Sequence, residues 1–296
     1  MKITIFTPTY NRCEKLKKLY SSLLNQTYNE FEWIIVDDGS TDETDLFIES
    51  IKSVKLRFQI IYIKQNNSGK HVAINKGVEN ASGELFFIVD SDDYLPSGSL
   101  EIIVNYINNL PKCDKFAGVG GLKAFTNEEI VGKTFSEKFV DCTSLERNKN
   151  NILGDKAEVF YTEILKKYPF PFFEGENFLT ESLVWYRIAN DGYKIRWFNE
   201  IIYFCEYCED GLTKKKSKYY DNYNGFLLQV KEELSYKEIS IIEKIKKLCV
   251  CLGYSKYKKM KIKYISGKLQ FNLILTWLFR EIGYIILRFI LRKKYE

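Results

Sequence analysis

Residues 85–93 read LFFIVDSDD, an unbroken apolar run followed at once by three aspartates in four positions. Such a run, ended by a polar turn, is typical of a strand that is buried on both faces of a parallel sheet. Carboxylates that leave a buried strand together are costly unless a cation neutralises them. Oxygen ligands of this kind suit Mn²⁺ or Mg²⁺, whose shell often includes substrate phosphates. The competing interpretation is a solvated acidic turn.

Strand-like runs and helical patterns alternate through the first 110 residues. The predicted strands cover residues 2–7, 31–36, 58–63 and 85–89, and helical patterns cover residues 11–25, 70–80 and 96–109, with a further helix opening at residues 41–44. This alternation predicts an α/β fold with a mostly parallel sheet and helices on both faces. Since the crossovers are right-handed, the carboxyl ends of the strands meet at one edge, where such sheets bind ligands.

Four polar clusters fall at that edge of the predicted sheet. They are residues 7–11, 37–40, 66–71 and 90–93. In the second cluster, Asp38 could accept hydrogen bonds from a nucleobase or a ribose, and Gly39 allows a close approach of the backbone to a ligand. An Asp-Gly turn with a capping serine is the alternative. The glycine-rich fingerprints of dinucleotide-binding and P-loop proteins are absent.

The charge of the chain is divided unevenly. The 296 residues carry a net charge of +5 and are 45% hydrophobic, which excludes a disordered chain. Residues 244–296 contain 14 Lys/Arg against two Glu, a net of +12, so residues 1–243 carry −7. The seven cysteines are irregularly spaced, and we expect no signal peptide ahead of the strand predicted at residues 2–7. We therefore expect reduced thiols and a cytoplasmic protein.

Four motifs together resemble those of family 2 glycosyltransferases. They are TPTYNR at residues 7–12, QTY at 26–28, VDDGSTD at 36–42 and VDSDD at 89–93. The resemblance implies the GT-A fold, inversion at the sugar, a nucleotide-diphosphate-sugar donor, often UDP-linked, and Mn²⁺ or Mg²⁺ on the diphosphate. It also implies a metal contact for Asp92. The nucleotide-binding residues implied are Thr7, Pro8, Tyr10, Arg12, Asp38, Lys70, Asp90 and Ser91.

The acceptor side and a general base must come from residues 111–215. Aligned on Arg187, the acidic pair of the family falls on Thr180 and Glu181, so that Glu181 stands where Asp is usual. A carboxylate there can take the proton of an acceptor hydroxyl. Glu176 is the alternative base, and a helix N-terminus capped by Thr180 is the structural alternative. The predicted catalytic domain spans residues 1–215, with a nucleotide-sugar-binding half at 1–110, and a basic, aromatic helical tail spans 216–296.

The tail contains a predicted helix over residues 227–252 and an apolar segment over 269–291. Arg280, Glu281 and Arg288 interrupt that segment, which argues against a membrane-spanning helix. An interfacial helix on the anionic inner face of the cell membrane fits better. Packing on the catalytic domain and a dimer surface are the alternatives. No module for nucleic acid is recognisable.

The combined prediction is a metal-dependent glycosyltransferase of polysaccharide biosynthesis. It would transfer a sugar, from a UDP-sugar by preference, to a hydroxyl of a glycan or a lipid-linked acceptor. A sugar-nucleotide nucleotidyltransferase is one alternative, although residues 7–12 lack the glycines of its loop. A non-catalytic peripheral membrane protein is the other, and it predicts that replacing Asp92 leaves function intact.

Overall fold

A computed structural model of the protein describes residues 1–112, 114–126, 128–206 and 217–292. The chain divides into two compact units. The sheet unit comprises Met1–Phe170 and Thr180–Lys214, and the helical unit comprises Pro171–Leu179 and Lys215–Glu296. The short segment Pro171–Leu179 thus groups with the C-terminal helices rather than with the strands on either side of it.

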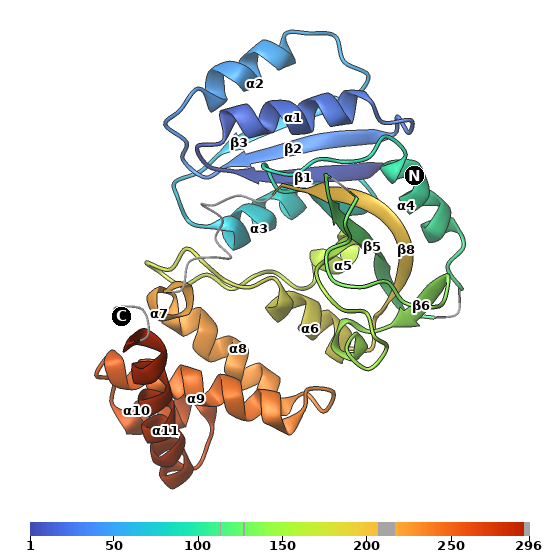
Figure 1. The fold of residues 1–296 in the computed structure, drawn as a ribbon. Helices are drawn as coiled ribbons and strands as arrows, with labels where there is room; N and C mark the ends of the chain where they lie inside the picture. The colour runs from blue at the N-terminus through green and yellow to red at the C-terminus, as the bar shows by residue number, and fades with distance from the viewer. Residues whose placement is uncertain (113, 127, 207–216, 293–296) are drawn as a thin grey trace. The chain divides into compact units, whose positions relative to one another are not determined.

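Within the described residues, one eight-stranded sheet of order β3-β2-β1-β4-β7-β5-β8-β6 forms the sheet unit (Figure 1). The strands are β1 (Ile3–Thr9), β2 (Phe31–Asp37), β3 (Gln59–Lys64), β4 (Leu85–Ile88), β5 (Phe116–Phe125), β6 (Phe139–Cys142), β7 (Lys156–Tyr161) and β8 (Lys194–Cys205). Strands β1 to β4 are parallel to one another, and so are β5 and β8. Strand β7 is antiparallel to both β4 and β5, and β6 to β8. The predicted α/β fold with a mostly parallel sheet is confirmed.

Helices cover both faces of this sheet. They are α1 (Cys13–Leu24), α2 (Thr44–Lys52), α3 (Lys70–Asn80), α4 (Ser99–Asn108), α5 (Thr162–Leu165) and α6 (Ser182–Asn190), with one 3₁₀ turn at Ser144–Glu146. One core joins apolar residues of α1, α2 and α4, such as Leu16, Ile48 and Ile103, to one face of the sheet. Helix α3 lies on the other side of the first strands from α1 and α2 (Figure 1).

The second face is built on aromatic contacts. The rings of Phe6 and Phe86 stack at 5.2 Å, and a Cβ at Gly77 of α3 would lie 2.3 Å from the Phe6 ring. Only glycine therefore allows α3 to approach β1 this closely. Trp185 of α6 stacks on Phe160 of β7 at 4.3 Å and is buried, so it belongs to the core.

The helical unit contains five helices among its described residues. They are α7 (Lys218–Asp221), α8 (Tyr223–Ser235), α9 (Ile241–Tyr257), α10 (Ile262–Leu269) and α11 (Leu273–Arg292). The single helix predicted over residues 227–252 is wrong, because the chain leaves the helical conformation at Tyr236. Ser240 then accepts a hydrogen bond from the backbone N–H of Glu243 at 3.2 Å and begins α9. The Ser-x-x-Glu sequence at 240–243 is a capping signal for a new helix.

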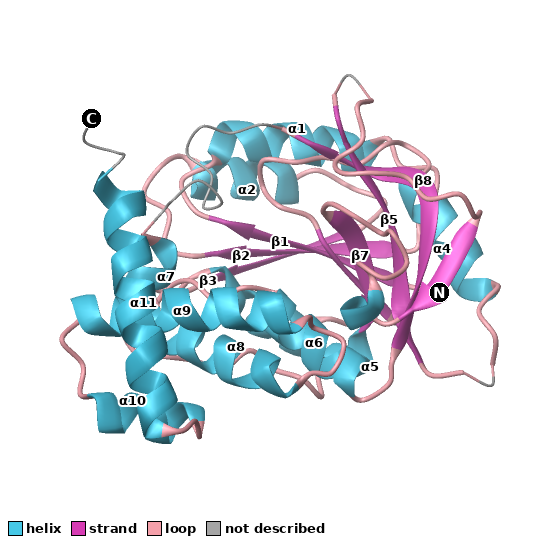
Figure 2. Ribbon diagram, turned by 60° about the horizontal axis from the view of Figure 1, so that its bottom comes forward, coloured by secondary structure: helices cyan, strands magenta, loops and turns pink. Residues whose placement is uncertain are grey.

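Helices α9 and α11 pack against each other through two glycines. A Cβ at Gly283 would lie 1.8 Å from the carbonyl oxygen of Cys249, and one at Gly253 would lie 2.6 Å from the Gly283 carbonyl carbon. Figure 2 shows helices α8 to α11 grouped together. Among the helices of the described residues, none combines the length and the apolar composition needed to cross a bilayer.

Candidate active site

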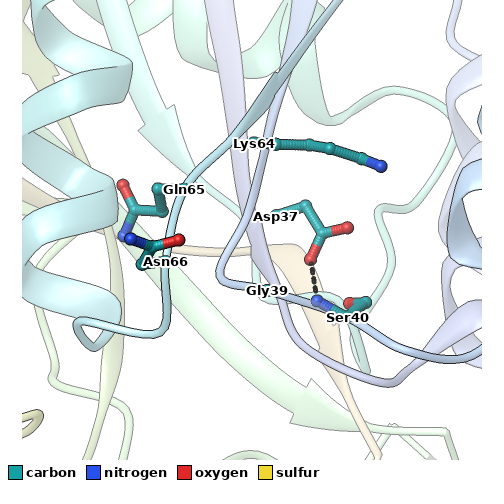
Figure 3. A pocket seen from close by; sticks show the side chains of 6 residues that line it. All are labelled: Asp37, Gly39, Ser40, Lys64, Gln65 and Asn66. Atoms are coloured by element: carbon teal, nitrogen blue, oxygen red, sulfur yellow. Dashed lines mark hydrogen bonds between the residues drawn. The ribbon is translucent and has the colours of Figure 1, made fainter.

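A polar pocket of about 270 Å³ lies where β2 and β3 end (Figure 3). Its lining consists of Asp37, Gly39, Ser40, Lys64, Gln65 and Asn66. The carboxylate of Asp37 accepts hydrogen bonds from the Ser40 N–H at 2.8 Å and from the Tyr62 hydroxyl at 2.6 Å. Gly39 has φ +90°, and a Cβ there would lie 3.3 Å from the backbone nitrogen of Asn67. A glycine here lets the loops after β2 and β3 approach each other.

Asp38, which follows the pocket residue Asp37, is buried. Its carboxylate accepts three hydrogen bonds of 2.8 Å, from Gln65 Nε2 and from the backbone N–H groups of Ser68 and Gly69. Asp38 is only 7% exposed. The side chain predicted to contact a nucleobase therefore holds the loop that forms one wall of the pocket and leads into α3.

The amino group of Lys70 bridges two carboxylates that come from distant parts of the chain. Its Nζ lies 2.6 Å from Asp90 Oδ1, just after β4, and 2.6 Å from Glu181 Oε1, just before α6. Burial works to lower the pKa of Lys70, but Asp90 and then Glu181 outweigh it, and the pKa is raised. Lys70 and Lys123 together lower the pKa of Asp90 against its burial. Lys70 and Asp90 are therefore both charged at neutral pH.

The other two aspartates of residues 90–93 have different partners. Asp92 forms an ion pair with the guanidinium of Arg12, and its side chain is 16% exposed. Asp93 accepts hydrogen bonds from the Tyr203 hydroxyl at 2.7 Å and from the Glu206 N–H at 3.0 Å. Burial, and then the negative charge of Asp90, raise the pKa of Asp93 to about 7. The three carboxylates are therefore not interchangeable.

The remaining predicted nucleotide-binding residues are distributed differently. Tyr10 is 48% exposed just after β1, whereas Ser91 is buried. Thr7 is fully buried, and its hydroxyl accepts a hydrogen bond from Trp33 Nε1 at 2.9 Å. Pro8 lies in β1 opposite Val36 of β2. The structure thus brings Arg12 to Asp92 and Lys70 to Asp90 and Glu181, while the Thr7 hydroxyl faces the core.

The two candidate bases have distinct surroundings. Glu181 is the N-cap residue of α6 but makes no capping hydrogen bond with its side chain, which is 34% exposed. The hydroxyl of Thr180 pairs with that of Ser182 at 3.0 Å. Glu176 is 8% exposed, and its carboxylate accepts hydrogen bonds from the N–H groups of Asn224 at 2.7 Å and Gly225 at 2.8 Å. The carboxylate of Glu176 therefore caps the first turn of α8. Glu181 is the carboxylate that contacts Lys70.

The side chains at this site could hold a divalent cation only together with oxygen atoms from a bound ligand. In the described part of the chain, no three His, Cys, Asp or Glu side chains gather in a group that could hold a metal ion. A Mn²⁺ or Mg²⁺ ion would thus need diphosphate oxygens and water in addition to Asp92, which is a common shell for Mg²⁺. Asp92 fits this role because its carboxylate is a hard oxygen donor and is partly exposed. Its pairing with Arg12 shows that a positive charge is accommodated there.

A second, smaller pocket contains residues that none of the sequence motifs includes. Besides Lys70, Asp90 and Glu181, it is lined by Lys123, Glu158 and Tyr203. Lys123 pairs with Asp155 at 2.7 Å. Lys123 could have indicated this pocket from the sequence alone. A lysine within the otherwise buried apolar strand β5 needs a partner or a ligand.

Comparison with known proteins identifies the class. The family described as glycosyl transferase family 2 matches residues 4–151, which is half of the chain. The chain belongs to this family, so the resemblance drawn from the four motifs is confirmed. Family membership favours a transferase over the nucleotidyltransferase and over the non-catalytic membrane protein.

Three similar proteins illustrate the relationship. The glycosyltransferase GlyA of Streptococcus pneumoniae is 33% identical over 153 residues, which are 50% of this chain and 21% of GlyA. The GalNAc(5)-diNAcBac-PP-undecaprenol beta-1,3-glucosyltransferase of Campylobacter jejuni is 26% identical over 290 residues, covering 95% of this chain and 88% of that protein. The crystal structure of Staphylococcus aureus TarS 1-349 in complex with UDP-GlcNAc superposes with a TM-score of 0.64 at 22% identity, covering 87% of this chain and 73% of TarS. This chain thus spans about a fifth of the length of GlyA.

Proposed function

We propose that this protein transfers a sugar from a UDP-sugar to a hydroxyl of a glycan or a lipid-linked acceptor, with inversion. The observation that carries the proposal is the convergence of Asp90, Lys70 and Glu181. Two of these residues belong to the half of the fold implied to bind the nucleotide sugar, and the third is the candidate base. The name of the C. jejuni relative specifies an undecaprenol-linked acceptor, and TarS is seen with UDP-GlcNAc. Both names support the substrate classes proposed here.

In this mechanism, Glu181 takes the proton of the acceptor hydroxyl while that oxygen attacks the anomeric carbon. The side chain of Glu181 is partly exposed and makes no capping bond at the start of α6. Its carboxylate pairs with the ammonium group of Lys70. A diphosphate next to Asp90 would attract the ammonium group, and Glu181 would then be free to act as the base.

The leaving group is a nucleoside diphosphate that gains negative charge as the glycosidic bond breaks. Arg12 and Lys70 supply positive charge at the edge where this group would lie. Asp92 would hold Mn²⁺ or Mg²⁺, which when bound stabilises charge on the diphosphate as a Lewis acid. The nucleobase of the donor would lie in the pocket of Figure 3, with Asp37 and the loop fixed by Asp38 as its walls.

We also propose that the helical unit attaches the enzyme to the anionic inner face of the cell membrane. Helix α11 exposes large apolar side chains, including Ile274 (75%), Phe289 (67%), Trp277 (56%) and Ile285 (53%). At 100° per residue, Ile274, Leu278, Ile282, Ile285 and Phe289 lie along one face of the helix. The basic residues of 244–296 supply charge for acidic headgroups, and the tail thus has both features of an interfacial helix.

Direct binding measurements test the donor part of the proposal. The full chain is titrated by calorimetry with UDP, UDP-sugars and GDP-mannose, with and without Mn²⁺. We expect UDP and at least one UDP-sugar to bind more tightly with Mn²⁺ present, and GDP-mannose to bind weakly. Failure of every nucleotide and nucleotide sugar to bind would remove the basis of the proposal.

A further inference from the structure

In the proposed reaction, the transferred sugar would occupy the second pocket of the sheet unit. In a single displacement, the anomeric carbon stands between the leaving diphosphate and the hydroxyl that the base deprotonates. Asp90 and Lys70 mark the nucleotide side, and Glu181 marks the acceptor side. The same pocket is lined by all three of these residues. A sugar bonded to the diphosphate therefore meets the other residues of its lining.

The pocket is small. Its free volume is about 20 Å³, which admits little more than one water molecule. Lys70 spans it by contacting Asp90 and Glu181 at once. A diphosphate that attracted the Lys70 ammonium would open this pocket to a sugar ring.

Glu158 is the one further carboxylate among the described residues that line this pocket. It lies in β7, opposite Gly120 of β5, and its side chain is only 13% exposed. Its ion pair with Arg147 is long, at 3.5 Å between Oε1 and Nη1. By comparison, Lys123 holds Asp155 at 2.7 Å. The buried carboxylate of Glu158 is thus weakly partnered and keeps lone pairs for a ligand.

The neighbours of Glu158 explain why a ligand would be favoured there. Burial raises the pKa of Glu158 to about 7, with Asp155 and Glu181 adding to the shift and Arg147 and Lys123 opposing it. Arg147 is itself held in place by the carbonyl of Gly154 and by the Trp197 ring, 4.8 Å from its Cζ. A buried carboxylate that lacks strong partners is stabilised by a hydroxyl donor.

We propose that Glu158 binds a hydroxyl group of the transferred sugar and thereby selects among donor sugars, an inference that rests on the proposed function. The sugars of common nucleotide donors differ in the orientation or substitution of single hydroxyl groups. A fixed carboxylate on one side of the ring accepts a hydrogen bond from one orientation and is left unpaired by the other. The ligand class is a neutral pyranose with a free hydroxyl directed at β7.

The test compares donor preference in the wild-type protein and in Glu158→Ala. Dissociation constants are measured by calorimetry with Mn²⁺ for UDP, UDP-glucose, UDP-galactose, UDP-GlcNAc and UDP-GalNAc. We expect the wild-type protein to prefer one sugar over its C4 epimer by about 10- to 100-fold, the range of one hydrogen bond to a charged group. In Glu158→Ala this preference should fall to about threefold or less, with the affinity for UDP unchanged.

Matched variants separate recognition from folding. Glu163→Ala removes a carboxylate that is 76% exposed on α5, and it should retain the wild-type preference. Glu158→Gln keeps the shape of the side chain and should also reduce the preference. It replaces Glu158→Ala in the test if that variant fails to fold. An unchanged epimer preference in a Glu158 variant that still binds UDP would overturn the inference while leaving the proposed function standing. Failure of the wild-type protein to bind UDP and every UDP-sugar would overturn both.

Discussion

Lys70 Nζ lies 2.6 Å from Glu181 Oε1, although the two residues are more than a hundred positions apart in the chain. The ion pair joins the first turn of α3 to the N-terminus of α6. It places a positive charge beside the candidate base. In the proposed mechanism, this lysine moves to the diphosphate of the donor.

Replacing Lys70 by Met should lower kcat/KM by about 100-fold, the usual effect of losing one charged group that stabilises a transition state. The affinity for UDP should fall as well, because the lysine is expected to contact the diphosphate. Lys76→Met on the same helix is the matched control, since its ammonium contacts the Lys64 carbonyl at 3.5 Å. Equal activity of the Lys70 and Lys76 variants would show that Lys70 has no part in transfer.

Replacing Asp92 by Asn should abolish the dependence of donor binding on Mn²⁺. A cation on the diphosphate is worth several kcal/mol in the transition state, so we expect a loss of about 100-fold or more in kcat. The measurement is a Mn²⁺ titration of UDP affinity and of turnover. Asp114→Asn, which removes an exposed carboxylate paired with Lys194 at 3.2 Å, should behave as the wild type. An unaltered Mn²⁺ response in the Asp92 variant would assign the metal elsewhere.

Asp38→Asn tests whether the buried loop anchor is needed for nucleotide binding. An amide accepts fewer and weaker hydrogen bonds than the carboxylate that now receives three. We expect the dissociation constant of UDP to rise by about 10-fold or more through displacement of the loop that walls the pocket. Calorimetry measures this, with Glu49→Gln on α2 as an exposed control. Wild-type affinity in Asp38→Asn would show that the loop holds its position without this residue.

Glu32 should link the stability of the sheet unit to acid pH. Burial disfavours its charge, but hydrogen bonds from Lys2, Ser82 and Thr4 outweigh this and lower the pKa from 4.5 to about 2. Because the folded pKa is below the unfolded one, the stabilisation is fully present above about pH 4.5. It is lost as the pH falls toward 2, and it amounts to about 3 kcal/mol.

Urea unfolding of Glu32→Gln measures this contribution. At pH 7 the variant should be less stable than the wild type by about 3 kcal/mol, and the difference should shrink as the pH is lowered from 4.5 toward 2. Glu30→Gln, an exposed neighbour, should change stability little at any pH. A difference between wild type and Glu32→Gln that stays constant from pH 7 to pH 2.5 would contradict the assignment.

Charges on the exposed face of α11 should weaken membrane binding. The double variant Ile285→Glu with Phe289→Glu places two carboxylates on a face that is 53% and 67% exposed at these positions. Binding to vesicles with 30% phosphatidylglycerol should fall by at least about 10-fold, and neutral vesicles should bind the wild type weakly. Leu46→Glu, at a 72% exposed position on α2, is the control. Unchanged vesicle binding in the double variant would exclude this face as the lipid contact.

The first half of the fold could be read from the sequence because its buried strands are continuous apolar runs that end in polar turns. Helix α3 begins and ends at the predicted residues, and β4 differs from its prediction by one residue. The strands β5 to β8 could not be assigned in this way. Strand β5 contains Gly118, Gly120 and Gly121, which disfavour strands locally. Packing requires glycine at two of these positions. A Cβ at Gly120 would lie 2.7 Å from Trp197 of β8, and one at Gly121 would lie 2.7 Å from Phe198.

The sequence predicted the site residues that follow a single strand. It did not predict the residues that several strands and helices bring together in space. The aspartates after β4 can be recognised as candidate site residues because they directly follow a buried apolar run. The contact of Lys70 with Glu181, and the presence of Glu158 and Lys123 in the same pocket, depend on how β5, β7 and α6 come together. No spacing in the sequence encodes those distances. Asp38 shows the converse, because its motif is recognisable but its three hydrogen bonds to the following loop are not.

In the proposed reaction, a sugar passes from a UDP-sugar to an acceptor hydroxyl with Glu181 as the base. The most direct measurement is the appearance of glycosylated acceptor, by mass spectrometry, when the protein is supplied with Mn²⁺, a panel of UDP-sugars and a polyprenol-diphosphate-linked glycan. We expect product from the wild type and from the exposed control Glu174→Gln, and a loss of about 10²- to 10⁴-fold in Glu181→Gln. Product formation by Glu181→Gln at the wild-type rate would contradict the account.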